Sequence, residues 1–177
     1  MEKSKKLAYA GFIAALMVVA SFIRIPLLIV PITLQVLVVI ICPVVFGIMP
    51  SFMGFFIYIL TGIIGLPVFA GGGGPAYVLN PTFGYIIGFL FASLPIGYIS
   101  KKYDNVAGYI VAGLSGILVI YFFGVLYLYL NINYIQGKDM SLLVAIKTGF
   151  LITITIDLLK LAIAIYVIVR LKKTLNI

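Results

Sequence analysis

Six long apolar stretches, almost free of charged side chains, dominate this sequence. Of its 177 residues, 64% are hydrophobic and only 9% are charged, whereas a soluble domain carries roughly 25% charged residues. A soluble domain of this size still exposes much of its surface and could not hide such a surplus. We therefore predict an all-α integral membrane protein, a single transmembrane domain over residues 1–177, because about 20 apolar residues make one spanning helix. The six expected spans are approximately 7–23, 33–49, 52–66, 82–99, 106–130 and 145–169.

Proline and glycine mark the breaks between these stretches. Residues 25–32 contain two prolines and favour a loop or a short extended link. The sequence Met49-Pro50-Ser51 predicts a tight break between the second and third helices. Residues 65–75 are apolar, yet their glycines and prolines forbid a regular helix.

The basic residues follow the sidedness that is usual for membrane proteins, whose cytoplasmic loops are rich in lysine and arginine. If the N-terminus is cytoplasmic, six spans place the C-terminus and the loop after the fourth helix on the same side. This distribution accounts for the formal net charge of +8 without nucleic acid. We expect a multi-pass plasma-membrane protein in contact with lipid, whose first apolar run is a spanning helix rather than a cleaved leader. The basic residues expected in the cytoplasm are Lys3, Lys5, Lys6, Lys101, Lys102, Arg170, Lys172 and Lys173.

Two charged residues interrupt the sixth apolar stretch. Asp157 and Lys160 are three positions apart, so they share one helix face near the middle of the span. Each charge costs about 2.5–3.5 kcal/mol there. The pair is either an internal ion pair that locks helix packing or a polar binding site that faces the bundle interior. A carboxylate accepts N–H donors and an ammonium donates to oxygen, so we predict that both contact a ligand carrying donors and acceptors.

The glycine-rich segment, residues 67–82, is expected to cap the outer mouth of a ligand cavity. Irregular backbone is tolerated at membrane depth only where it is buried in protein or lines a cavity. Glycines allow close backbone approach and can present N–H groups to an anion or a carbonyl. A flexible outer loop is the alternative, and Asn80 either caps the fourth helix or hydrogen-bonds a ligand. The ligand contacts expected here are Phe69, Gly71, Gly72, Gly73, Gly74 and Asn80.

Three further polar side chains are candidate ligand contacts with an ordinary alternative. Thr33 and Gln35 lie at the start of the second apolar run, where interhelical hydrogen bonds would also explain them. Tyr85, early in the fourth run, fits either a ligand contact or an aromatic belt at the membrane surface.

Small residues recur at four-residue spacing along the first helix. Ala10 and Ala14 form one such pair, and Gly11 and Ala15 form another. Faces of this kind let a second helix approach closely. That helix belongs either to this chain or to a partner protein.

The sequence contains few of the residues on which enzyme chemistry depends. Histidine is absent and Cys42 is the single cysteine, so neither a Ser-His or Cys-His site nor a metal site of the usual kind is expected. The glycine run at 71–74 lacks the Lys-Ser/Thr of a phosphate-binding loop. We therefore expect no catalytic residue, no metal and no cofactor, and any use of ATP must come from a partner.

Several of these segments together resemble the BioY family, the biotin-binding S components of energy-coupling factor (ECF) transporters. The resemblance covers nearly the whole chain. The segments that carry it are residues 31–36 (PITLQV), 65–74 (GLPVFAGGGG), 81–89 (PTFGYIIGF) and 157–160 (DLLK).

This resemblance implies six helices, capture of biotin from outside the cell, and docking onto a membrane coupling subunit with two cytoplasmic ATPases. It implies that Ala10 and Ala14 match an Ala-x-x-x-Ala docking motif, and that Asn80, Asp157 and Lys160 touch biotin. Family members often carry a basic residue in the fourth helix, and this sequence has none between residues 83 and 99. The alternatives are an S component for another vitamin, a membrane-embedded enzyme with Asp157 as base, and a solitary carrier.

Overall fold

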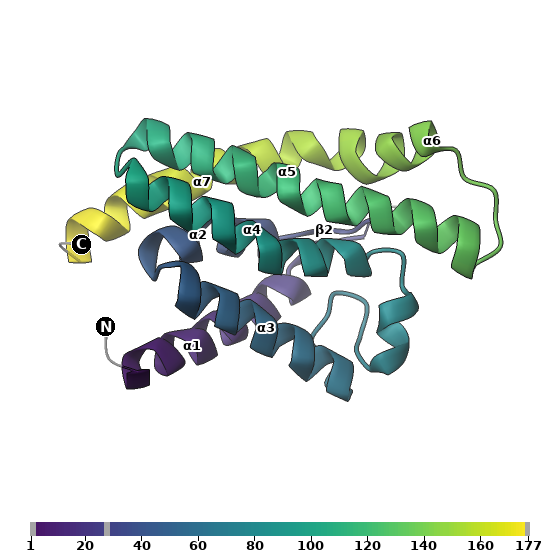
Figure 1. Ribbon diagram of the computed structural model, residues 1–177, viewed down its shortest axis with the longest axis horizontal. Coiled ribbons are helices and arrows are strands. Elements are labelled where there is room, and N and C mark those ends of the chain that lie inside the picture. Colours follow the sequence, from purple (N-terminus) through teal and green to yellow (C-terminus); the bar gives the residue numbers. More distant parts are fainter. Residues whose placement is uncertain (1–2, 27–28, 176–177) are drawn as a thin grey trace.

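The computed structural model describes residues 3–26 and 29–175, which form a bundle of six apolar helical stretches (Figure 1). The last stretch joins a short α-helix, a π-helical turn and a long α-helix without a break. Four of the stretches are long and apolar enough to cross a membrane, and two are shorter. The stretches are α1 (Lys3–Phe22), α2 (Gln35–Val45), α3 (Ile48–Ile64), α4 (Phe83–Lys102), α5 (Val106–Leu130), and α6 (Leu142–Ile146) continued by η3 (Lys147–Leu151) and α7 (Ile152–Leu175).

The helices pack in two groups, which meet at α2 and where α3 packs against α4. Helices α4 and α5 run side by side, with α7 against α5, while α1 packs across α3 (Figure 1). Helix α2 contacts both α7 and α4. The predicted all-α membrane bundle of six helices is confirmed.

The break between the second and third helices differs from the prediction. Helix α2 ends at Val45, and α3 begins at Ile48, after Gly47 with a φ of 89°. Glycine adopts positive φ without the steric cost of a side chain. Pro50 lies in the first turn of α3, where its missing N–H costs no helical hydrogen bond. The predicted break at Met49-Pro50-Ser51 is therefore wrong, and these three residues are helical.

The link between α1 and α2 is extended, as predicted. Strand β1 (Arg24–Ile25) pairs antiparallel with β2 (Ile32–Thr33). The N–H of Leu34 donates to the carbonyls of Ala20 and Ile23, both at 3.2 Å, which ties the end of the hairpin to α1. As a result α2 begins at Gln35, two residues after the predicted start.

The segment between α3 and α4 contains one 3₁₀-helix, η1 (Pro75–Leu79). It is held to α5, because the Tyr127 hydroxyl donates to the Val78 carbonyl and Asn131 Nδ2 donates to the Leu79 carbonyl at 2.9 Å. Asn131 begins a π-helical turn, η2 (Asn131–Ile135), that extends α5. The glycine-rich segment is thus anchored to the end of α5.

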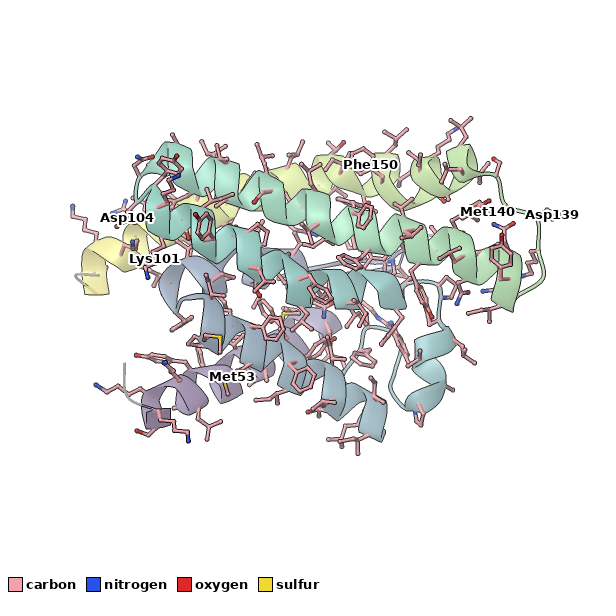
Figure 2. All side chains as sticks on the ribbon, viewed as in Figure 1. Met53, Lys101, Asp104, Asp139, Met140 and Phe150 are labelled. Carbon is pink, nitrogen blue, oxygen red and sulfur yellow. The ribbon has the colours of Figure 1, made fainter. Side chains whose placement is uncertain are left out.

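The start of α1, the end of α7 and the α4–α5 turn lie at one end of the bundle, on the left in Figure 1. Lys101 and Asp104 mark this end in Figure 2, whereas Asp139 and Met140 lie at the opposite end. The lysines of the last turns of α4 and α7 belong to the first of these ends. We call it the basic end.

Candidate functional site

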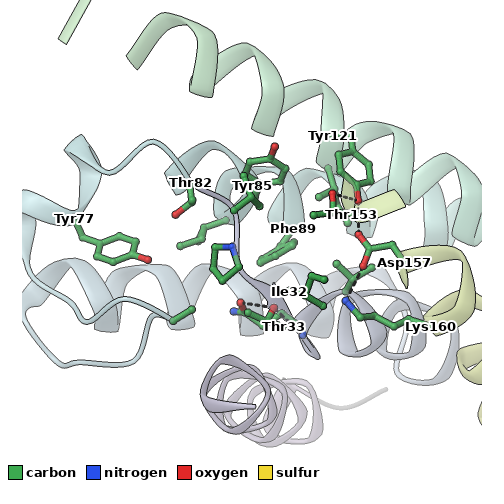
Figure 3. Close-up of a pocket in the computed structure, with 17 residues that line it drawn as sticks. Ile32, Thr33, Tyr77, Thr82, Tyr85, Phe89, Tyr121, Thr153, Asp157 and Lys160 are labelled. Atoms are coloured by element: carbon green, nitrogen blue, oxygen red, sulfur yellow. Dashed lines mark hydrogen bonds and ion pairs between the residues drawn. The ribbon is translucent and has the colours of Figure 1, made fainter. Parts of the chain in front are cut away.

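A cavity lies between the β1–β2 hairpin, α2, α4, α5 and α7, and one side of it meets the glycine-rich segment (Figure 3). Its volume is about 60 Å³, which is room for a few water molecules. Most of the wall is aliphatic or aromatic, and a few polar groups point inward. The lining residues are Val30, Pro31, Ile32, Thr33, Gln35, Val36, Ala70, Tyr77, Thr82, Tyr85, Ile86, Phe89, Ile120, Tyr121, Thr153, Asp157 and Lys160.

The polar centre of the cavity is an ion pair on α7. Lys160 Nζ lies 2.7 Å from Asp157 Oδ1, and the two side chains are only 7% and 9% exposed. The residues are one helical turn apart, as their spacing predicted. Attraction between the charges offsets part of the cost of taking each out of water. The pair leaves the second carboxylate oxygen of Asp157 to other partners.

Tyr121 of α5 contacts that second oxygen. Its hydroxyl donates to Asp157 Oδ2 at 2.6 Å and lies 2.8 Å from Thr153 Oγ1 (Figure 3). Sequence reasoning missed both Tyr121 and Thr153. Thr153 precedes Asp157 by four residues on the same helix face, which is a signal that could have found it. Tyr121 is one of twelve tyrosines, and no neighbouring residue in the sequence identifies it as part of a site.

A π-helical turn positions the next wall of the cavity. Within η3, the carbonyl of Gly149 accepts a hydrogen bond from the Tyr85 hydroxyl at 2.8 Å. π-helical turns are rare and occur frequently at functional sites. Tyr85 was a predicted site residue, and the structure places its ring in the cavity wall rather than in a surface belt, with 7% of the residue exposed.

Thr33 and Gln35 form a buried hydrogen-bonded chain with Tyr58 of α3. Thr33 Oγ1 donates to Gln35 Oε1 at 3.1 Å, and Gln35 Nε2 donates to the Tyr58 hydroxyl at 2.7 Å. That hydroxyl in turn donates to the carbonyl of Val68 at 3.3 Å. The interhelical hydrogen bond that was the ordinary alternative is therefore present. Thr33 and Gln35 also line the cavity.

The other predicted contacts in the glycine-rich segment lie beside the cavity rather than in its lining. Phe69 is 1% exposed and packs against the rings of Tyr58 and Tyr77. Phe69 and Gly72 exchange backbone hydrogen bonds of 2.8 and 3.0 Å, so this segment is a closed turn. The segment reaches the cavity through Ala70, Tyr77 and Thr82. The residues Gly71, Gly72, Gly73 and Gly74 are not part of the lining.

Asn80 organises the entry to α4. Its Oδ1 accepts hydrogen bonds from the Thr82 N–H at 3.0 Å and the Thr82 hydroxyl at 2.8 Å. These hydrogen bonds form an Asx turn over residues 80–82, immediately before α4 begins at Phe83. Thr82 lines the cavity and Asn80 lies just outside its lining.

On α1, the structure buries the pair that was expected to dock onto a partner. Ala10 and Ala14 are 0% and 8% exposed, and the Ala10 carbonyl faces Gly54 of α3. The other small pair, Gly11 and Ala15, is exposed. Neighbouring positions on a helix point about 100° apart, so the side of α1 that packs against α3 carries Ala10 and Ala14, and the pair one position further on lies outside that contact. Ala10 and Ala14 therefore pack within this chain, the alternative that the sequence left open, and the accessible small-residue face of α1 is the Gly11–Ala15 face.

The cavity presents both kinds of hydrogen-bonding group to a ligand. Asp157 accepts and Lys160 donates, while the amide of Gln35 does both. The aromatic and aliphatic walls suit an apolar ring system that carries a small polar head. Among residues 3–26 and 29–175, no group of three or more His, Cys, Asp or Glu side chains could hold a metal ion.

Known proteins match this chain over almost its full length. The probable biotin transporter BioY of Lysinibacillus sphaericus is 39% identical over 158 residues, which cover 88% of this chain and 81% of that protein. The biotin transporter BioY of Thermotoga maritima is 38% identical over 170 residues, which are 96% of each chain. The crystal structure at 2.1 Å of the S-component for biotin from an ECF-type ABC transporter aligns with a TM-score of 0.83 and 28% identity. That alignment covers 98% of this chain and 95% of the other.

The family assignment agrees with the fold, with these relatives and with the motifs that suggested it. The sequence profile of the BioY family matches residues 1–177. This chain therefore belongs to the BioY family.

Proposed function

We propose that this protein takes up biotin, as a membrane-embedded binding component that captures the vitamin in the cavity beside Asp157 and Lys160. The observation that carries the proposal is the buried network of Asp157, Lys160 and Tyr121 in an otherwise apolar wall. Two further findings support it: the similar proteins are named biotin transporters, and the fold is shared with an S-component for biotin.

The chemistry of biotin complements this cavity. Its ureido ring offers two N–H donors and one carbonyl, its bicycle is apolar, and its tail ends in a carboxylate. Asp157 accepts from the ureido N–H groups, and Lys160 donates to the carbonyl or remains paired with Asp157. Thr33, Gln35 and Tyr85 complete the polar contacts, and Phe89 packs against the bicycle.

Biotin is larger than a few water molecules, so binding has to widen the cavity. We assign this movement to the outer wall, where the glycine-rich segment acts as the cap. In the widened site Phe69 and Asn80 contact the ligand, and N–H groups of residues 71–74 exchange their present hydrogen bonds for bonds to the polar atoms of the ligand.

Uptake driven by ATP needs partners, because the sequence has no phosphate-binding loop of its own. We propose that the chain works in the plasma membrane with both termini cytoplasmic, together with an ECF coupling subunit and two ATPases. The exposed Gly11–Ala15 face of α1 offers the coupling subunit a surface that allows close helix approach. The chain itself binds and releases biotin, with no catalytic step and no cofactor.

Calorimetric titration of the purified protein with biotin tests the proposal. We expect tight binding with near-unit stoichiometry, and weakening of about 10- to 150-fold in Asp157→Asn and in Lys160→Ala, since a hydrogen bond to a charged group contributes roughly 1.5–3 kcal/mol. Lys147→Ala removes the same charge from an exposed position of the same helical stretch and serves as the control. It should bind like the wild type.

Helical circular dichroism and thermal unfolding of each variant establish that it is folded. Folded wild-type protein that takes up no biotin would refute the biotin assignment. Equal weakening in Lys147→Ala and Lys160→Ala would refute the location of the site.

A further inference from the structure

The basic end of the bundle contains a second hollow, separate from the biotin cavity. Its volume is about 580 Å³, and it lies between α1, the α2–α3 turn and the ends of α4 and α7. The floor and one wall come from residues 43–49, most of which are apolar. Lys101 and Asp104 mark its position in Figure 2.

Three helices each supply one lysine to this hollow. Lys6 comes from α1, Lys101 from the last turn of α4, and Lys172 from the last turns of α7. Among the described residues Asp104 is the only acidic group in the lining. Lysines from elements so far apart in the sequence meet only because the fold brings the helix ends together.

The single acid is already engaged within the protein. Asp104 forms an ion pair with Lys172 and accepts a hydrogen bond from the Tyr109 hydroxyl. The Lys172 ammonium, and after it Tyr109, hold the pKa of the Asp104 carboxyl below its usual range, so it is ionised at neutral pH. It therefore offsets one lysine, and Lys6 and Lys101 give the hollow an excess of positive charge.

We propose that this hollow binds the phosphate-bearing headgroup of an anionic membrane lipid. Basic pockets between transmembrane helices at the cytoplasmic surface suit such headgroups, because the lysines meet the phosphate while adjacent apolar surface meets the start of the acyl chains. Phe46 and Met49, in the same lining, supply that apolar surface. A free phosphate would use the lysines but leave this surface in contact with water.

The biotin cavity contains neither Lys6 nor Lys101, so lipid binding can be tested independently of biotin binding. The test compares two double variants that remove the same charge. Lys6→Gln/Lys101→Gln removes two lysines of the hollow. Lys102→Gln/Lys173→Gln removes two lysines of the same end that lie outside the lining, and Lys102 lies over the ring of Tyr103 instead.

The measurement is the affinity of the purified protein for phosphatidylglycerol in neutral detergent, by native mass spectrometry over a lipid titration. Phosphatidylcholine and glycerol phosphate are titrated in parallel. One surface lysine contributes about a fivefold change in affinity for anionic lipid, so Lys6→Gln/Lys101→Gln should lose about thirtyfold. The wild type and Lys102→Gln/Lys173→Gln should bind phosphatidylglycerol equally and in preference to phosphatidylcholine.

Equal losses in the two double variants, or no loss in either, would overturn the proposal. Glycerol phosphate that binds as tightly as phosphatidylglycerol would identify a free-phosphate site and overturn the lipid assignment. Calorimetry with biotin checks that each variant is folded. If the double variant does not fold, Lys101→Gln alone carries the test, since Lys101 is exposed at the end of its helix and its expected loss is about fivefold.

Discussion

Asp157 and Lys160 lie inside the bundle, where either charge alone would cost much free energy. The groups around them explain how the protein tolerates both. Removing one partner of a buried ion pair costs about 3–5 kcal/mol, because the other charge is left uncompensated. Here Lys160 meets one carboxylate oxygen of Asp157 and Tyr121 meets the other. Tyr121 thus positions the carboxylate that we expect to accept the ligand N–H groups.

At this scale we expect Tyr121→Phe to weaken biotin binding by about 10- to 150-fold while the fold is retained. The ring remains, and one charge-assisted hydrogen bond of roughly 1.5–3 kcal/mol is lost. Tyr98→Phe, at a residue of α4 that is 64% exposed, is the matched control. Calorimetry measures both variants. Unchanged biotin affinity in folded Tyr121→Phe would show that this hydroxyl does not position the Asp157 carboxylate for binding.

Among the elements, the contact between α1 and α3 depends most clearly on one missing side chain. A Cβ at Gly54 would lie 2.7 Å from Ile13 Cβ and 2.8 Å from the Ala10 carbonyl oxygen. Neither atom can move without shifting α1. Glycine at this point therefore sets the distance between the two helices, as small residues do in many membrane helix pairs.

We therefore expect Gly54→Ala to destabilise the protein by about 1–3 kcal/mol, the usual cost of overpacking a well-packed contact. Gly11→Ala adds the same methyl group to α1, where no atom lies within 4 Å, and should leave stability nearly unchanged. Thermal unfolding in detergent compares the two. Equal melting temperatures would mean that α1 and α3 separate without cost.

The sequence was sufficient to predict the six helices and the buried pair, because both depend on local signals. Long apolar stretches are visible without any knowledge of packing, and so is a charge inside one of them. Tyr121 could not be predicted, since its role depends on how α5 is rotated against α7. The burial of Ala10 and Ala14 could not be predicted for the same kind of reason. Two small-residue pairs lie one position apart, and only the packing against α3 decides which of them is buried.

For the molecule as a whole, the basic end determines how the bundle is expected to sit in the membrane. The start of α1, the end of α7 and the α4–α5 turn lie there, while Asp139 and Met140 lie at the opposite end (Figures 1 and 2). Lysine and arginine favour the cytoplasmic side. The fold therefore gathers basic residues of α1, α4 and α7 at one end of the bundle, as the sequence predicts.

We expect cysteines placed at the two ends to be labelled from opposite sides of the membrane. Ser4 and Ser141 are both exposed, and the native Cys42 is only 1% exposed, so an introduced thiol dominates the signal. An impermeant maleimide added to intact cells should label Ser141→Cys and spare Ser4→Cys. Permeabilised cells should show labelling of both. The reverse pattern in intact cells would invert the orientation.

The pairing of Asp157 with Lys160 also has an electrical consequence. No other charged side chain is buried among residues 3–26 and 29–175. A membrane voltage does work of about 2.3 kcal/mol per elementary charge and 100 mV, but equal and opposite charges one helical turn apart feel nearly cancelling forces. The transmembrane field therefore exerts almost no net force on the polar centre of the cavity. Voltage can act on ligand capture only through a charge that the ligand itself carries.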